Sequence, residues 1–143
     1  MKKLTLLFSL ALVTTGCADD VLDRAVSLQS ETLDYFCGCS VQRGDFPDRT
    51  SCEQGSPDFA PPTGAFLDCY ERVLDGAPSA DVEAIECGLD ASEANLSCLN
   101  AAGCDNNEQI LACGDQFEAA SNACPQVSEL TGSMFNTCIG DDG

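Results

Sequence analysis

Cysteine spacing constrains the fold of this chain more than any other feature of its sequence. Cys87 and Cys98 are eleven residues apart, and so are Cys113 and Cys124. Eleven residues are about 20° past three full turns of a helix, so both members of each pair face the same way. The two helices can oppose Cys87 to Cys124 and Cys98 to Cys113, because positions 87 and 124 have the same sum as 98 and 113. We therefore predict an antiparallel helical hairpin with two disulfide rungs.

The N-terminal segment predicts export, which is the condition under which such disulfides form. Lys2 and Lys3 precede an apolar run over residues 4–13 and three small residues at 14–16. The run is about half as long as a bilayer-spanning helix, so residues 1–16 are predicted to be a signal peptide. Cysteines outside the cytoplasm form disulfides by default, and residues 17–143 should form a single cysteine-rich domain.

Gly16-Cys17 after the apolar run resembles the lipobox of bacterial lipoprotein precursors, although Thr14 stands where that family prefers leucine. The resemblance implies that Cys17 is acylated and becomes the N-terminus, which anchors the chain to a membrane. Ala18, in place of an aspartate, implies the outer membrane of a Gram-negative bacterium. The alternative is ordinary signal cleavage after Ala18. The whole chain loosely resembles acidic, cysteine-rich lipoproteins of unknown role, which implies no activity.

Ten cysteines follow Cys17, an even number that can pair completely. Beyond the two rungs, six cysteines allow fifteen connectivities, and we expect Cys104 to pair with Cys138. The predicted half-cystines are Cys37, Cys39, Cys52, Cys69, Cys87, Cys98, Cys104, Cys113, Cys124 and Cys138.

Apolar periodicity predicts an all-α, disulfide-stapled array of four or five helices. An amphipathic helix should begin at Val21 and end near Cys37. Ser40 to Gly64 is rich in glycine and proline, which predicts one long irregular loop restrained by Cys52. A second helix is expected over residues 65–75, where Gly76 and Pro78 follow.

The remaining helices make up the C-terminal half. Residues 79–102 carry one bulky and one small stripe on opposite sides, which predicts a helix packed between two neighbours. A break at Gly88 is the less favoured alternative, because both stripes stay in phase across it. Asp105 and Glu108 form a capping-box pattern that opens a fourth helix. A last helix is expected over residues 127–138, with Leu130 and Met134 inward.

The charge balance restricts the partners. Without residues 1–16 the chain has four arginines and twenty-four acidic residues. Nucleic acid and anionic lipid headgroups repel such a surface, whereas basic proteins are attracted to it. The main effect of the charge is expected to be high solubility.

Residue types also limit the chemistry. Histidine is absent from the chain, so Ser-His-Asp and Cys-His catalysis are impossible. The spacings of zinc sites and calcium loops are missing as well. We therefore expect no enzyme, no catalytic residue, no metal, no cofactor and no small-molecule substrate.

The predicted function is that of a noncatalytic, lipid-anchored envelope or surface protein with an acidic helical face for a basic protein partner. The alternative is a periplasmic thiol-disulfide redox factor that uses Cys37-Gly38-Cys39. The chain has no histidine, and no lysine after residue 16, that could lower the thiol pKa in that motif, which favours the first function.

Overall fold

The computed structural model describes residues 17–56 and 64–140, so the predicted signal peptide lies outside the described residues. Among the described residues there is no strand, and the helices are α1 Cys17–Gln42, α2 Arg49–Gly55, α3 Ala65–Gly76, α4 Ser79–Ala102, α5 Asn107–Ala123 and α6 Glu129–Gly140. The predicted all-α fold with a helical hairpin is confirmed, with six helices in these ranges instead of four or five.

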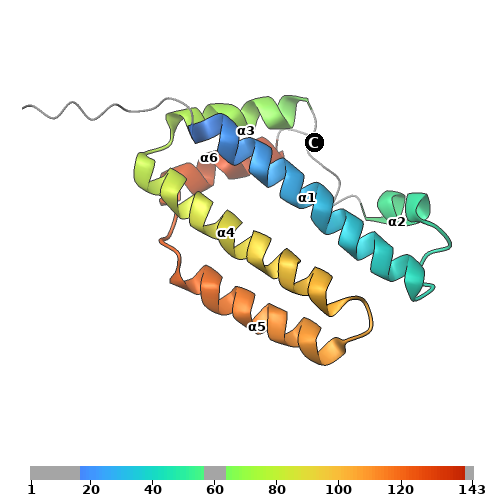
Figure 1. The fold of residues 1–143 in the computed structure, drawn as a ribbon. Coiled ribbons are helices and arrows are strands. Elements are labelled where there is room, and N and C mark those ends of the chain that lie inside the picture. Colours follow the sequence, from blue (N-terminus) through green and yellow to red (C-terminus); the bar gives the residue numbers. More distant parts are fainter. Residues whose placement is uncertain (1–16, 57–63, 141–143) are drawn as a thin grey trace, which may run out of the picture.

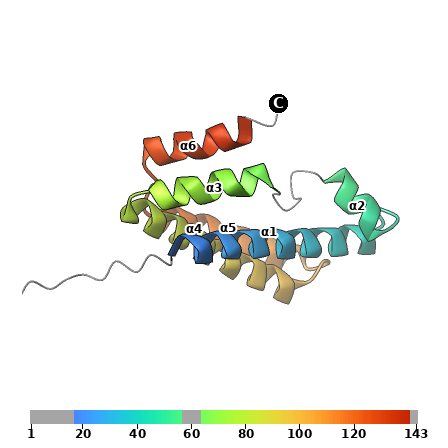
Figure 2. The same ribbon diagram turned by 90° about the horizontal axis from the view of Figure 1, so that it is seen from above.

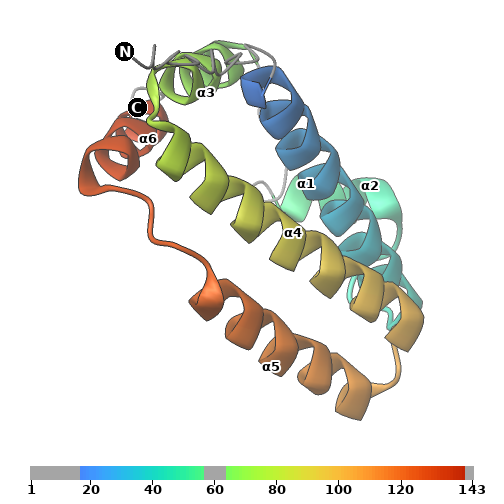
Figure 3. The same ribbon diagram turned by 60° about the vertical axis from the view of Figure 1, so that its left-hand side comes forward.

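Three long helices, α1, α4 and α5, lie side by side in one layer with α4 in the middle (Figure 1). Helices α1 and α4 run parallel, because Arg24 near the start of α1 pairs with Glu93 in α4, and Tyr35 further along donates to the Gly103 carbonyl oxygen. Helix α5 returns antiparallel to α4 and forms the edge of the layer (Figure 3). The prediction that α4 is packed between two neighbours is therefore confirmed.

A second, smaller layer consists of α3 and α6, which lie across one end of the three-helix layer (Figure 2). Tyr70 of α3 contacts Phe135 of α6, with ring centroids 4.7 Å apart, and stacks on Phe66 of its own helix at 4.5 Å. Burial of the Tyr70 hydroxyl raises its pKa. The short helix α2 packs against α1, far from α6 along the layer (Figure 1).

Helix α1 is longer than the sequence pattern indicates. We expected it to end near Cys37, but it continues to Gln42 and therefore includes the whole Cys37-Gly38-Cys39 motif. The last turn is fixed by tertiary contacts, because Cys39 forms a disulfide with Cys104 and Gln42 donates a 3.0 Å hydrogen bond to Asp105. These long-range contacts override a local sequence that carries a weak helix signal.

The predicted irregular loop over residues 40–64 contains the helix α2, which is a correction to the sequence analysis. Asp48 caps this helix by accepting a 2.8 Å hydrogen bond from the Ser51 amide, and this bond lowers the pKa of Asp48. The capping signal was present in the sequence, but the surrounding glycines and prolines concealed it. The remainder of the loop, residues 57–63, lies outside the described residues.

Helix α4 has the predicted bounds, and it continues without a break through Gly88. Helix α5 begins one residue later than the predicted capping box implies. Its N-cap is Asn106, whose side chain accepts from the Gln109 amide at 3.2 Å, so the expected Asp105–Glu108 box is wrong. The cause is the Cys39–Cys104 disulfide beside it, which fixes the turn before Asn106.

The expected inward face of α6 is also wrong. Leu130 is 71% exposed and Met134 is 40% exposed, whereas Thr131 and Cys138 are buried. Thr131 hydrogen bonds to Asp81 of α4, and Cys138 is joined to Cys69 of α3. A polar contact and a disulfide therefore decide which face of α6 turns inward, and both outweigh the apolar residues.

Candidate interaction surface on a disulfide-fixed hairpin

Two disulfides join α4 to α5 as the rungs of a ladder. Cys98 pairs with Cys113 and Cys87 with Cys124, and the Cα atoms are 5.7 Å apart in both pairs. These are the pairs that the cysteine spacing predicts. One rung lies at Cys113 in the middle of α5 and the other at Cys124 just after its last residue, so the second half of α5 is fixed covalently to α4.

The other three disulfides join α1 to α2, α1 to the α4–α5 turn, and α3 to α6. Their partners are Cys37 and Cys52, Cys39 and Cys104, and Cys69 and Cys138. The expected Cys104–Cys138 disulfide is therefore wrong. All ten predicted half-cystines are bonded, and α3 and α6 share no disulfide with the other four helices.

Helix geometry explains why neighbouring cysteines take distant partners. Cys37 and Cys39 are two residues apart in α1, so their side chains are about 200° apart around the helix axis. Cys37 turns to α2 and Cys39 to the α4–α5 turn. In a helix that continues through this motif, the angle between the two side chains requires two separate partners.

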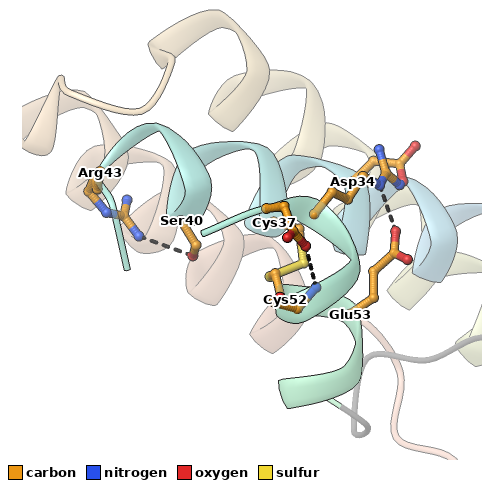
Figure 4. The surroundings of a disulfide bond; sticks show 9 residues. Asp34, Cys37, Ser40, Arg43, Cys52 and Glu53 are labelled. Atoms are coloured by element: carbon orange, nitrogen blue, oxygen red, sulfur yellow. Dashed lines mark hydrogen bonds and ion pairs between the residues drawn. A yellow bond between two sulfur atoms is a disulfide. The ribbon is translucent and has the colours of Figure 1, made fainter. Parts of the chain in front are cut away.

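The Cys37–Cys52 disulfide fixes α2 against α1 at the centre of a small apolar cluster (Figure 4). Both sulfur-bearing residues are fully buried, and Leu33 and Phe46 pack beside them. On the exposed side, Arg49 of α2 bridges Asp34 of α1 and Glu53 of its own helix. This exposed bridge raises the pKa of Arg49 and adds little to stability beside the disulfide.

Asp81 connects the two layers by accepting three hydrogen bonds from one end of α6. The Ser128 hydroxyl donates at 2.6 Å, the Thr131 hydroxyl at 2.5 Å and the Ser128 amide at 2.9 Å. These donors hold the pKa of Asp81 below its usual range. Since the α3–α6 disulfide does not reach α4, this polar contact is a main attachment of α6 to the larger layer.

The outer side of α5 combines an exposed apolar residue with acidic residues. Leu111 is 71% exposed, and Glu108, Asp115 and Glu118 lie three residues before it and four and seven residues after it. Those spacings put all three carboxylates within about 60° of Leu111 around the helix. The helix contains no lysine or arginine. We call these four residues the acidic face of α5.

The arginines are occupied elsewhere. Arg24 pairs with Asp90 and Glu93, Arg43 pairs with Asp45, and the Arg72 side chain donates to the Asp68 carbonyl oxygen. Together with Arg49, these are the four arginines that follow residue 16. None of these arginine contacts involves a residue of the acidic face of α5.

The described residues contain no group of three or more metal-ligating side chains that could hold a metal ion. Within the same ranges, no helix is both long and apolar enough to cross a bilayer. Cys17, the predicted lipidation residue, is the first residue of α1.

No family model, curated protein or solved structure matches this chain. The residues and their geometry must therefore carry the functional argument.

Proposed function

We propose that this protein is a noncatalytic, lipid-anchored protein of the bacterial cell envelope that presents an acidic helical face to a basic protein partner. The observation that carries the proposal is the acidic face of α5, on a helix that two disulfides join to α4 at its middle and at its C-terminal end. A rigid surface loses little entropy on binding, so a preorganised acidic helix favours a partner of opposite charge.

The charge distribution supports a basic partner. Glu108, Asp115 and Glu118 share one face, and no cation of the chain occupies α5. Opposite charge on a partner steers association and selects against acidic competitors, an effect that weakens with ionic strength.

A redox role at Cys37-Gly38-Cys39 has less support. The two cysteines are 0% and 4% exposed, and each is bonded to a partner from another part of the chain. A redox pair needs an accessible thiol, and both residues are buried.

The proposed anchor is Cys17, acylated after removal of residues 1–16, and the proposed location is the outer membrane of a Gram-negative bacterium. The start of α1 at Cys17 is compatible with this anchor, because no folded segment has to separate the helix from the membrane. Metabolic labelling with a palmitate analogue tests it: the label should be incorporated into the wild type and lost in Cys17→Ser.

The partner proposal is tested by cross-linking in native membranes. The variant Glu108→Gln/Asp115→Asn/Glu118→Gln neutralises the acidic face without changing its shape. We expect the principal cross-linked protein to be basic. Its cross-linking should be lost with this variant and should weaken as the salt concentration rises. Glu71→Gln/Asp75→Asn on the exposed side of α3 is the matched control and should retain it. Equal cross-linking of both variants contradicts the proposed role of α5.

A further inference from the structure

An apolar trough runs along α4 between α1 and α5. Its larger part has a volume of about 310 Å³ and is bounded by Leu28 of α1, Leu99 of α4 and Phe117 of α5. A smaller part of about 200 Å³ lies between α4 and α5, beside Ala94 and Ala120. The two parts adjoin, because Asn95 and Phe117 line both.

The trough continues a helix face that is covered elsewhere. Asn95 follows Asp81 by fourteen residues, which is about 40° short of four turns, so both lie on one face of α4 about 21 Å apart. At Asp81 the face is closed by α6, whose hydroxyls bond to that carboxylate. Helices α3 and α6 lie at the end of the layer where α4 begins (Figures 1 and 3). Further along, the apolar residues of the same face line the open trough.

Asn95 lies on the floor of the trough with an incomplete set of hydrogen bonds. Its Oδ1 atom is buried and, within the described part of the chain, accepts no hydrogen bond. A buried acceptor without a donor costs about 1–3 kcal/mol. A polar atom left unsatisfied beside an open apolar surface is expected where a partner supplies the missing donor.

We propose that the trough binds a basic amphipathic helix, at a side of α5 separate from its acidic face. The trough covers residues 91–99 of α4, about 12 Å of helix, which matches the span of partner side chains at positions i, i+4 and i+7. These apolar side chains fill the trough, and the partner's lysines or arginines are attracted by the net negative charge of the chain.

Charge decides between the candidate occupants. A second copy of this strongly acidic chain is repelled, because acidic residues outnumber lysine and arginine by twenty-four to six. A fatty acid or another small anion finds no cation among the residues that line the trough. A basic helix satisfies both the apolar surface and the excess negative charge.

The test uses a fluorescent peptide of leucine and lysine with helical periodicity, titrated with the purified mature protein while anisotropy is measured. Ala94→Leu/Ala120→Leu fills the trough with side chains that a helix tolerates. We expect it to weaken binding at least tenfold. Ala101→Leu/Ala119→Leu makes the same change at exposed positions of the same two helices that do not line the trough, and should bind like the wild type.

Equal binding of the trough variant and its control, or equally tight binding of a scrambled peptide of the same composition, overturns the proposal. Failure of the wild type to bind the periodic peptide overturns it as well. If the double variant does not form all five disulfides, Ala120→Leu alone repeats the test on the exposed helix. None of these results depends on the native partner, so the acidic-face variant in membranes tests the proposed function separately.

Discussion

Removal of the outer rung of the ladder gives the sharpest test of how α5 is held. The change is Cys87→Ala/Cys124→Ala, in residues that are only partly buried, so loss of packing contributes little. With the inner Cys98–Cys113 rung intact, the lost constraint is a ring of about 22 residues, eleven from each helix. The chain-entropy relation for a loop of that size gives about 3.4 kcal/mol at 25 °C.

The inner rung closes a loop of 15 residues, worth about 3.0 kcal/mol, so removal of both rungs should cost about 6.4 kcal/mol. Small domains have about 5–15 kcal/mol in total. The variant without either rung should therefore be close to unfolding at 37 °C, whereas the variant without the outer rung stays folded.

Urea denaturation of the oxidised proteins measures both losses as changes in the free energy of unfolding, with the slope fitted for each variant. Ser97→Ala/Asn122→Ala is the control, since both residues are exposed neighbours of the cysteines and keep every disulfide. It should change the free energy of unfolding by less than about 0.5 kcal/mol. A loss below about 1 kcal/mol on removal of the outer rung would refute the view that the ladder restrains α5.

Three further predictions concern single side chains. Asn95→Ala should raise the free energy of unfolding by about 1 kcal/mol, because it removes an unpaired buried acceptor and favours helix; a loss in urea denaturation would contradict this. Asp81 has a lowered folded pKa, so its stabilising effect is complete above the usual value of about 3.9 and is lost as pH falls through the folded pKa. Asp81→Asn should reduce the loss of unfolding free energy at low pH and speed amide hydrogen exchange in α6. An unchanged loss at low pH would exclude the Asp81 contact as the cause of that loss. Tyr35→Phe should cost about 1 kcal/mol by removing the 3.1 Å hydrogen bond to Gly103, and loss of protection at the α4–α5 turn would locate the effect.

The arrangement of disulfides indicates which helices should unfold first. Helices α1, α2, α4 and α5 are connected by four disulfides, whereas α3 and α6 are connected only to each other. Cooperative units often coincide with such motifs, so the α3–α6 pair is the part that should detach first at low pH. The acidic face of α5 belongs to the more strongly connected part.

The sequence by itself determined the all-α class, the bounds of α4, and the ladder of α4 and α5. Eleven-residue spacing and a short turn are local, periodic signals, and helix geometry converts them directly into facing cysteines. The two stripes of α4 likewise predicted a neighbour on each side. The excess of acidic residues on α5 is visible in the sequence as well.

Only the tertiary structure decided the other three disulfides, the extension of α1 to Gln42, and the inward face of α6. Pairing of Cys39 with Cys104 depends on the parallel packing of α1 on α4, which no spacing encodes. Thr131 rather than Leu130 turns inward because Asp81, fifty residues earlier, accepts its hydrogen bond. Long-range contacts of this kind are chosen by the whole packing, so a local pattern cannot predict them.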